Sequence, residues 1–230
     1  MDVMKHYKPK FELMRRIIGK DDPVIVEIGA HFGEDSLRFA QTFPGLQLSC
    51  FEPDPRCTAA FKKYVNDPRI ALYEVALSDT DGKATFYQSY ESHNAPAPTK
   101  YDWIEEEFYN LHELNNSGAS SLKKGYTLNK ENPIEVETMR FDKWYHSTAI
   151  KTIDLVWLDV QGAEREVIEG MGDTIQHVNL IWMEYGETQY EGALSRTETI
   201  ELLKTKNFVA VSQLSDSTAA GDLLFKRRGI

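Results

Sequence analysis

Apolar and polar positions divide this chain into two alternating kinds of segment. Short apolar runs, typical of buried parallel strands, occur at 24–28, 48–51, 70–77, 153–160 and 179–185. Amphipathic stretches with helical spacing follow them at 35–43, 56–65, 163–171 and 196–204. This alternation predicts an α/β fold built on a doubly wound, Rossmann-like sheet that is mostly parallel.

The two ends of the chain add elements to this pattern. Apolar spacing predicts a short helix at 11–18, within an N-terminal helical segment at 1–20. Two final apolar runs, at 208–212 and 222–226, are joined by a loop rich in Ser, Asp, Ala and Gly. They predict an antiparallel hairpin at the edge of the sheet.

The middle of the chain breaks the alternation. Asp81-Gly82 is a hairpin turn signal, and strands are expected at 84–88 and 134–139. Residues 89–133 are rich in Pro, Asn, Ser and aromatic residues, with one candidate helix at 103–114. Because long insertions in compact domains are often functional, we interpret 89–133 as a lid or substrate-binding insertion in a single domain, 1–230.

Composition narrows the class of protein. The chain has 230 residues, which fits one domain, and its 36 acidic against 26 basic residues give a net charge of −10. This charge disfavours nucleic acid as the partner, because phosphate binding needs clustered Lys and Arg. Two cysteines are too few for a disulfide framework and favour a reducing compartment. No apolar run approaches the ~18 residues of a membrane span, so we expect a cytoplasmic protein.

The most informative motif is Glu27-Ile28-Gly29-Ala30-His31-Phe32-Gly33. It joins a strand to a helix through a glycine turn, which lets the backbone approach a flat polar cofactor. Glu52 ends the next strand, 23 positions after Gly29. Nucleotide-binding α/β folds place a ribose-binding carboxylate at about this offset, ~20 residues. The two features together predict a cofactor site.

The residues of the turn indicate which cofactor. Dinucleotide sites prefer G-x-G-x-x-G, whose middle glycine lets the pyrophosphate approach, and here that position is His31. Glu27 would repel a pyrophosphate and suits a cationic ligand. S-adenosylmethionine carries an ammonium and a sulfonium and no phosphate, so the charges favour it over a dinucleotide. The alternative is that Gly29 and Gly33 only form a tight turn. His31 either contacts cofactor or substrate or fills the loop.

Acidic residues also end several other strands of the expected sheet. Ligands of open α/β sheets bind beyond these strand ends. Asp159 can act as a general base or a metal ligand, or cap its loop. Glu184 can join it in holding Mg²⁺ or another divalent cation, although no third ligand is evident. Glu164 either stabilises the dipole of the following helix or contacts the substrate.

The expected insertion supplies further candidates. Tyr90 and Trp103 can stack on a sugar ring or another flat substrate, and His93 is a candidate base. The alternative is that these aromatic side chains form a small core that holds the insertion in place. The last two strands of the chain can pair with a second subunit to form a homo-oligomer, although nothing in the sequence requires it.

The chain resembles the FkbM family of class I S-adenosylmethionine-dependent methyltransferases, from about Pro23 to Phe208. Family members often have Glu where this chain has Gln161. The motifs that carry the resemblance are 26–33, Phe51-Glu52-Pro53, Val75-Ala76-Leu77-Ser78-Asp79 with Gly82, Gly118-Ala119-Ser120-Ser121-Leu122 and Leu158-Asp159-Val160-Gln161-Gly162-Ala163-Glu164.

The resemblance implies O-methylation, often of sugars, glycans or polyketide products. It implies that Glu27 and Gly29 surround the methionine moiety of the cofactor and that Glu52 holds the ribose hydroxyls. Ser78 or Asp79 would lie near the adenine, Ser120 and Ser121 near the cofactor, and Asp159 beside the transferred methyl. The remaining cofactor-binding candidates in these motifs are Ala30, His31, Gly33, Pro53 and Gln161.

Four functions are therefore weighed. The leading one is an O-methyltransferase that acts on a hydroxyl of a sugar or glycan. The second is the same chemistry on a small phenolic or polyketide acceptor, assisted by a divalent cation. The third is an NAD-dependent oxidoreductase, which the missing middle glycine disfavours. The fourth is a non-catalytic binding domain of a larger glycan-modifying assembly, which would bind the cofactor poorly.

Overall fold

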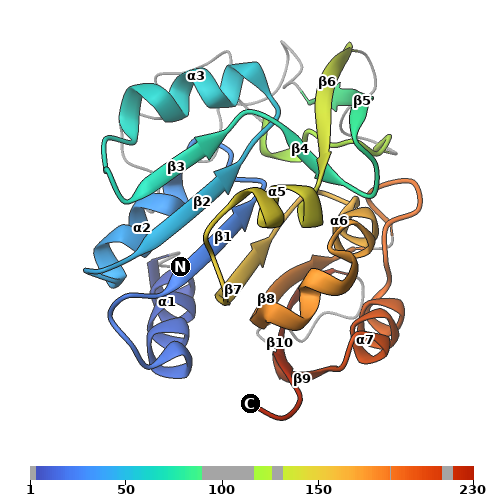
Figure 1. Ribbon diagram of the computed structural model, residues 1–230. Helices are drawn as coiled ribbons and strands as arrows, with labels where there is room; N and C mark the ends of the chain where they lie inside the picture. Colours follow the sequence, from blue (N-terminus) through green and yellow to red (C-terminus); the bar gives the residue numbers. More distant parts are fainter. Residues whose placement is uncertain (1–3, 90–116, 126–131, 187, 214–219) are drawn as a thin grey trace.

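The computed structural model describes residues 4–89, 117–125, 132–186, 188–213 and 220–230 (Figure 1). A seven-stranded sheet forms its centre, with the strand order β3-β2-β1-β7-β8-β10-β9. The first five strands of this order are parallel, while β10 is antiparallel to both β8 and β9. The prediction of a mostly parallel sheet with a C-terminal antiparallel hairpin is confirmed. The strands are β1 (Val24–Ile28), β2 (Gln47–Phe51), β3 (Ile70–Tyr73), β7 (Ile153–Leu158), β8 (Val178–Tyr185), β9 (Phe208–Gln213) and β10 (Gly221–Arg227).

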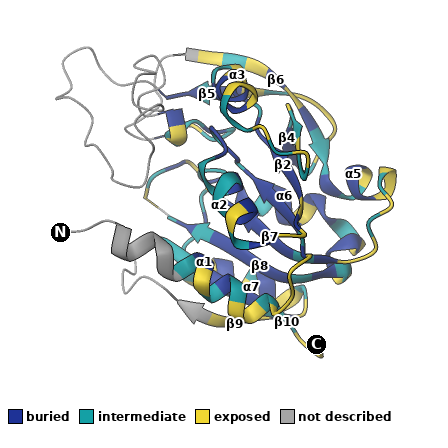
Figure 2. Cartoon of the chain, turned by 90° about the vertical axis from the view of Figure 1, so that its left-hand side faces the viewer, coloured by how far each residue is buried: buried dark blue, intermediate teal, exposed yellow. Residues whose placement is uncertain are grey.

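Helices cover both faces of this sheet, as a doubly wound fold requires. One apolar cluster joins α1 (Met4–Ile18), α2 (Glu34–Thr42) and α3 (Pro55–Tyr64) to Ile25, Leu48 and Trp157. The other joins α5 (Phe141–Ser147), α6 (Glu164–Gly170) and α7 (Arg196–Thr205) to Val26 and Val156. A 3-10 helix, η3 (Gly172–His177), also lies on this second face. Figure 2 shows β7 and β8 largely buried between the helices.

Helix α1 begins at Met4, earlier than the helix predicted at 11–18. The apolar spacing starts at Phe11, and Phe11 and Met14 join the core. Within the described ranges, no helix is both long enough and apolar enough to cross a membrane.

A second, three-stranded sheet lies at the upper right of Figure 1 and corrects two predictions. It contains β4 (Ala76–Ser78), β5 (Gly82–Gln88) and β6 (Asn132–Arg140) in the order β4-β6-β5. The prediction of a single strand at 70–77 is wrong. Strand β3 of the main sheet ends at Tyr73, and residues 76–78 form β4 of the second sheet. The hairpin expected at Asp81-Gly82 is also wrong, since β4 and β5 each pair with β6. The periodicity of apolar residues indicates which face of a strand is buried, but it does not indicate which other strand it pairs with.

Candidate active site

The alternation of side chains brings the strand-end acids to one face of the main sheet. Successive residues of a strand point to opposite faces. Trp157 and Trp182 face the α1–α3 side, and Asp159 and Glu184 follow each of them by two residues. Likewise, Glu27 lies two residues after Ile25, and Glu52 lies two residues after Cys50. Ile25 and Cys50 belong to the apolar cluster on the α1–α3 side. These four acids therefore lie at the carboxyl ends of β1, β2, β7 and β8, on the same face of the sheet.

The turn after β1 is packed tightly against its neighbours. Gly29 has a φ of +88°, and a Cβ atom there would lie 1.7 Å from the backbone oxygen of Asp159. The backbone N–H groups of Gly29 and Ala30 donate to Phe51 O at 2.9 and 3.0 Å. Only glycine fits both the conformation and the space. The turn is thus fixed between the ends of β2 and β7.

Glu52 is buried beside this turn, and backbone groups orient both of its carboxylate oxygens. Oε2 accepts from the N–H of His31 at 2.9 Å, and Oε1 accepts from the N–H of Asp54 at 2.8 Å. Burial raises the pKa of Glu52 to about 7, although these hydrogen bonds oppose the shift. Pro53 is half-buried between the two contacts. Each oxygen keeps a lone pair, so the carboxylate can accept from a pair of adjacent hydroxyl groups.

His31 connects the turn to another part of the chain. It has a φ of +50°, its Nδ1 lies 2.8 Å from Glu34 Oε1, and its Nε2 lies 2.7 Å from Ser117 Oγ. Burial lowers the pKa of His31, but the Glu34 carboxylate and the Cys57 side chain together outweigh it, so the pKa rises well above its usual value. His31 thereby holds the 3-10 helix η2 (Ser117–Ala119) against the turn.

Glu27 has partners inside the protein. Its Oε2 accepts from the Ser36 hydroxyl, and the Cys50 thiol donates to the same oxygen at 3.4 Å. Burial raises the pKa of Glu27 well above its usual value, and the nearby charge of Asp35 raises it further. Through the Ser36 hydroxyl, Glu27 joins β1 to α2. Its contact with the cofactor stays a prediction.

Sequence reasoning missed a polar group at the start of α3. Asp54 caps this helix by accepting from the N–H of Arg56 at 3.0 Å, and it accepts from Gln88 Nε2 at 2.9 Å. Arg56 pairs with Asp54 at 2.6 Å and donates to Ser120 Oγ at 3.2 Å. The Asp54-Pro55 pair is a helix-start signal that identifies the cap. No local signal links Arg56 to Ser120, which lies 64 positions away.

A second polar group lies beyond β7 and β8. Gln161 Nε2 donates to Asp159 Oδ1 at 2.6 Å and to Glu184 Oε2 at 2.8 Å. The hydroxyl of Tyr190 donates to Gln161 Oε1 at 2.9 Å. Asp159 is exposed, whereas burial, followed by the charges of Asp159 and Glu164, raises the pKa of Glu184 well above its usual value. Tyr190 carries no sequence signal that marks it as part of the site.

Two candidate residues stabilise the loop that carries Gln161. The Ser121 hydroxyl donates to Gln161 O at 2.6 Å. Glu164 Oε1 accepts from the N–H groups of Gly162 and Val160 at 3.1 and 3.3 Å. Burial raises the pKa of Glu164 to about 7. Both side chains are thus turned toward loop backbone.

Ser78 and Asp79 contact other parts of the chain, and their place near the adenine stays a prediction. A Cβ atom on Gly170, the last residue of α6, would lie 2.0 Å from Ser78 O. The backbone oxygen of Asp79 accepts from Arg140 at 2.6 Å, on the second sheet. Tyr90, His93, Trp103 and the candidate helix at 103–114 lie outside the described residues.

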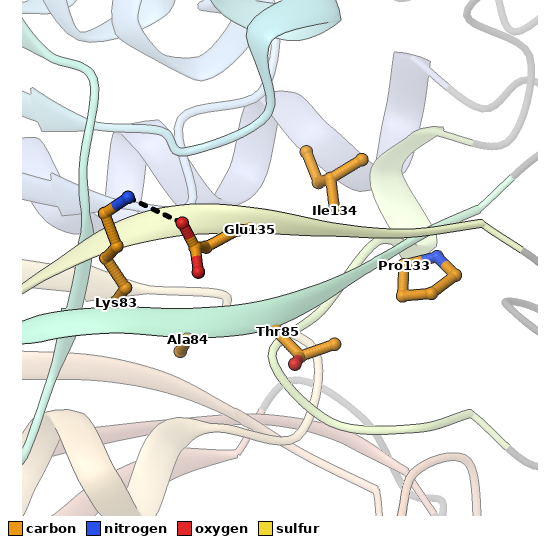
Figure 3. Close-up of a pocket in the computed structure, with 6 residues that line it drawn as sticks. All are labelled: Lys83, Ala84, Thr85, Pro133, Ile134 and Glu135. Atoms are coloured by element: carbon orange, nitrogen blue, oxygen red, sulfur yellow. Dashed lines mark hydrogen bonds and ion pairs between the residues drawn. The ribbon is translucent and has the colours of Figure 1, made fainter.

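The metal interpretation gains no support. In the described ranges, no group of three or more His, Cys, Asp or Glu side chains is arranged to hold an ion. Asp159 and Glu184 are instead bridged by the amide of Gln161. A hollow of about 270 Å³ lies on the second sheet, lined by residues 83–85 and 133–135 (Figure 3). Lys83 and Glu135 form a 2.6 Å ion pair there, and none of the strand-end acids lines it.

The fold is of the Rossmann-like type, with a tight glycine turn after β1. The chain belongs to the FkbM methyltransferase family, whose domain model matches residues 27–210. It is an S-adenosylmethionine-dependent methyltransferase. This assignment decides against the oxidoreductase and the non-catalytic binding domain.

Individual relatives agree with the family. The chain is 36% identical over 196 residues to the 2-O-methyltransferase NoeI of Sinorhizobium fredii. This match covers 84% of the chain and 76% of NoeI. It is 25% identical over 222 residues to the AMB antimetabolite synthetase AmbE of Pseudomonas aeruginosa, covering 89% of this chain but 10% of AmbE. The Methanococcus jannaschii fibrillarin pre-rRNA processing protein shares the fold, with a TM-score of 0.52 at 10% identity over 92% of this chain and 69% of that one.

Proposed function

We propose that this protein transfers the methyl group of S-adenosylmethionine to a hydroxyl group of a sugar or glycan. The observation that carries the proposal is the exposed carboxylate of Asp159, which ends β7 on the same sheet face as the buried carboxylate of Glu52. In this proposal Glu52 serves the cofactor, and the exposed Asp159 meets the second ligand. NoeI, the relative at 36% identity, is a 2-O-methyltransferase, which supports oxygen as the atom methylated.

In this proposal the cofactor lies along the turn after β1. Glu52 accepts hydrogen bonds from the ribose hydroxyls, because its two oxygens are held in a fixed orientation by backbone N–H groups. The close approach of Gly29 to Asp159 brings the turn next to the acceptor side. The bound cofactor supplies a methyl group made electrophilic by the sulfonium.

The acceptor side then needs alignment and a base. Bound S-adenosylmethionine would supply the methyl group to the acceptor oxygen, and S-adenosylhomocysteine would leave as the product. Asp159 takes the proton of the hydroxyl group. Alignment can lower the barrier by up to ~7–11 kcal/mol, and a positioned base adds roughly 10²–10⁴-fold.

The sugar acceptor and the location are further parts of the proposal. The FkbM assignment supports a sugar or glycan, since such acceptors are frequent in that family. The acid-rich surroundings of Asp159, including Glu164 and Glu184, favour a neutral hydroxylated acceptor over an anionic one. Cys50 and Cys57 are buried free thiols, which supports a reducing compartment such as the cytoplasm.

The first experiment is calorimetric titration with S-adenosylhomocysteine, the product of the cofactor, alongside NAD. We expect micromolar binding of S-adenosylhomocysteine, none of NAD, and at least tenfold weaker binding in E52Q. E201Q, at an exposed position on α7, is the matched control. A panel of neutral sugars, uronic acids and phenols, assayed for methyl transfer with and without Mg²⁺, then tests the acceptor. Methylation of phenols alone would overturn the sugar assignment.

A further inference from the structure

Asp35 has a buried carboxylate oxygen without a hydrogen-bond partner beside the turn after β1. It is the second residue of α2, and among the described residues nothing donates to its Oδ1. Burying an acceptor without a donor costs free energy, so such an atom calls for an explanation. An acid in the first turn of a helix stabilises the helix dipole. That effect accounts for the charge at this position but not for the missing donor.

The neighbours of Asp35 show where its carboxylate lies. Ser36, the next residue, donates to Glu27 near the end of β1. The charge of Asp35 acts on Glu27, and the charge of Asp159 acts on Asp35. Strand β1 lies between β2 and β7 in the main sheet. Asp35 therefore lies beside the end of β1 on its β7 side, whereas Glu52 follows β2 on the other side.

Charged groups on three elements act on the carboxylate of Asp35. Burial has the largest effect and raises the pKa of Asp35 to about 6, so the group is mostly ionised at pH 7. Lys10 of α1 and Arg38 of α2 attract its negative charge, whereas Glu34 and Asp159 repel it. Neither of the two cations donates a hydrogen bond to Oδ1. A carboxylate oxygen in this state fits a cationic group that carries N–H donors.

We propose that Asp35 binds the ammonium group of the methionine moiety of S-adenosylmethionine. The inference rests on the proposed function, because it assumes that the ribose lies at Glu52 and that the cofactor follows the turn after β1. The methionine moiety then extends from the β2 side past β1 toward β7, where Asp35 lies. An ammonium group has three N–H donors, and a sulfonium has none. Of the two cations of the cofactor, only the ammonium can therefore supply the hydrogen bond that Oδ1 lacks.

Two ligands that differ only in the ammonium group test this contact. Calorimetry measures how the wild type and D35N bind S-adenosylhomocysteine and its deamino analogue, in which a hydrogen replaces the amino group. We expect D35N to weaken the binding of S-adenosylhomocysteine roughly 10- to 100-fold, because a hydrogen bond between charged groups is lost. The wild type should bind the analogue more weakly by a similar factor, and D35N should bind it no more weakly than the wild type. This double-mutant cycle isolates the contact, since a purely structural role of Asp35 would weaken both ligands alike.

Two control variants accompany the cycle. E201Q, at the exposed position on α7, should bind both ligands as the wild type does. K10M removes a cation that attracts Asp35, and it should keep the preference for S-adenosylhomocysteine over the analogue. A preference that is lost in K10M and kept in D35N would assign the recognition of the amino acid to Lys10 and overturn the inference.

The remaining outcomes separate the inference from the proposed function. Equal affinities of the wild type for the two ligands, or equal weakening of both by D35N, would overturn the role of Asp35. A larger loss for S-adenosylmethionine than for S-adenosylhomocysteine in D35N would place the carboxylate at the sulfonium instead. If E52Q leaves the Kd for S-adenosylhomocysteine unchanged, the proposed placement of the cofactor is wrong. If E52Q weakens binding and the cycle shows no coupling, only the role of Asp35 is wrong.

Discussion

The cofactor side and the acceptor side of this site hold their acids by different means. On the cofactor side, residues 29–33 and Glu52, the carboxylate is fixed by the backbone N–H groups of His31 and Asp54. On the acceptor side, residues 159–164 and Glu184, the two carboxylates share the side-chain amide of Gln161. Backbone donors remain when side chains change, which suits a cofactor that stays the same. Side-chain donors are lost when a single residue is substituted, so the acceptor side is the easier of the two to alter.

The largest effect should come from a substitution at Gly29, where the turn of the cofactor side contacts Asp159 of the acceptor side. In G29A the new Cβ atom would lie 1.7 Å from Asp159 O, at a φ of +88°. Overpacking and backbone strain together should reduce the free energy of unfolding by roughly 2–6 kcal/mol. Thermal and urea unfolding measure this loss, and calorimetry should show no binding of S-adenosylhomocysteine. G118A is the control, since its Cβ atom would meet only His31 at 3.8 Å.

A narrower change should disable the acceptor side alone. D159N keeps the shape of the side chain but removes the proposed base, so kcat should fall roughly 10²–10⁴-fold. The affinity for S-adenosylhomocysteine should stay within threefold, because Glu52 and the turn are untouched. Steady-state kinetics with the methylated acceptor and calorimetry measure the two quantities. A parallel loss of both would show that the two sides are not separable.

The pH dependence of cofactor binding should show the ionisation of Glu52 on the cofactor side. Burial raises the pKa of Glu52 to about 7, and ribose hydroxyls donate to its ionised form. Binding therefore favours loss of the proton, so affinity should rise with pH. Between pH 6 and 8 the ionised fraction grows about tenfold for such a group, and the Kd for S-adenosylhomocysteine should fall by a similar factor. In E52Q this slope should disappear.

The smallest effect should come from loosening the contact between η2 and the turn. S117A removes the hydroxyl that lies 2.7 Å from Nε2 of the half-buried His31. The loss of one hydrogen bond should lower the free energy of unfolding by about 1 kcal/mol. The Kd for S-adenosylhomocysteine should change by less than threefold, because Glu34 still holds the ring. A larger change in Kd would mean that His31 itself contacts the cofactor.

Most of the main sheet could be predicted because its signals are local. Buried runs such as 24–28 and 153–160 leave one choice of element, and the strand-turn-helix at 24–43 carries its own glycine signal. The switch of sheet after Tyr73 could not be predicted, since the apolar pattern of 76–78 fits either sheet. Residues 76–78 pair with β6, which lies more than 50 positions further along the chain.

The site follows the same division. The positions of Glu52 and Asp159 follow from the rule that ligands bind beyond strand ends. Their surroundings do not, because Gln161 bonds Tyr190 across 29 positions and His31 bonds Ser117 across 86. The contacts of Glu27 with Ser36 and Cys50 also join residues 9 and 23 positions apart, and no local pattern marks them. The burial of a side chain and its hydrogen-bond partners depend on the folded structure, so the sequence alone does not reveal them.

The order β8-β10-β9 at one end of the main sheet constrains how the chain can assemble. Strand β10 lies between two strands that precede it in the sequence, and β9 has no other neighbour in the sheet. During synthesis, β9 therefore leaves the ribosome with no strand to pair with until β10 follows. The contacts of α7 with β9 can hold this part of the chain meanwhile. The acceptor side, whose Glu184 lies opposite Asp222 of β10, is completed only after that insertion.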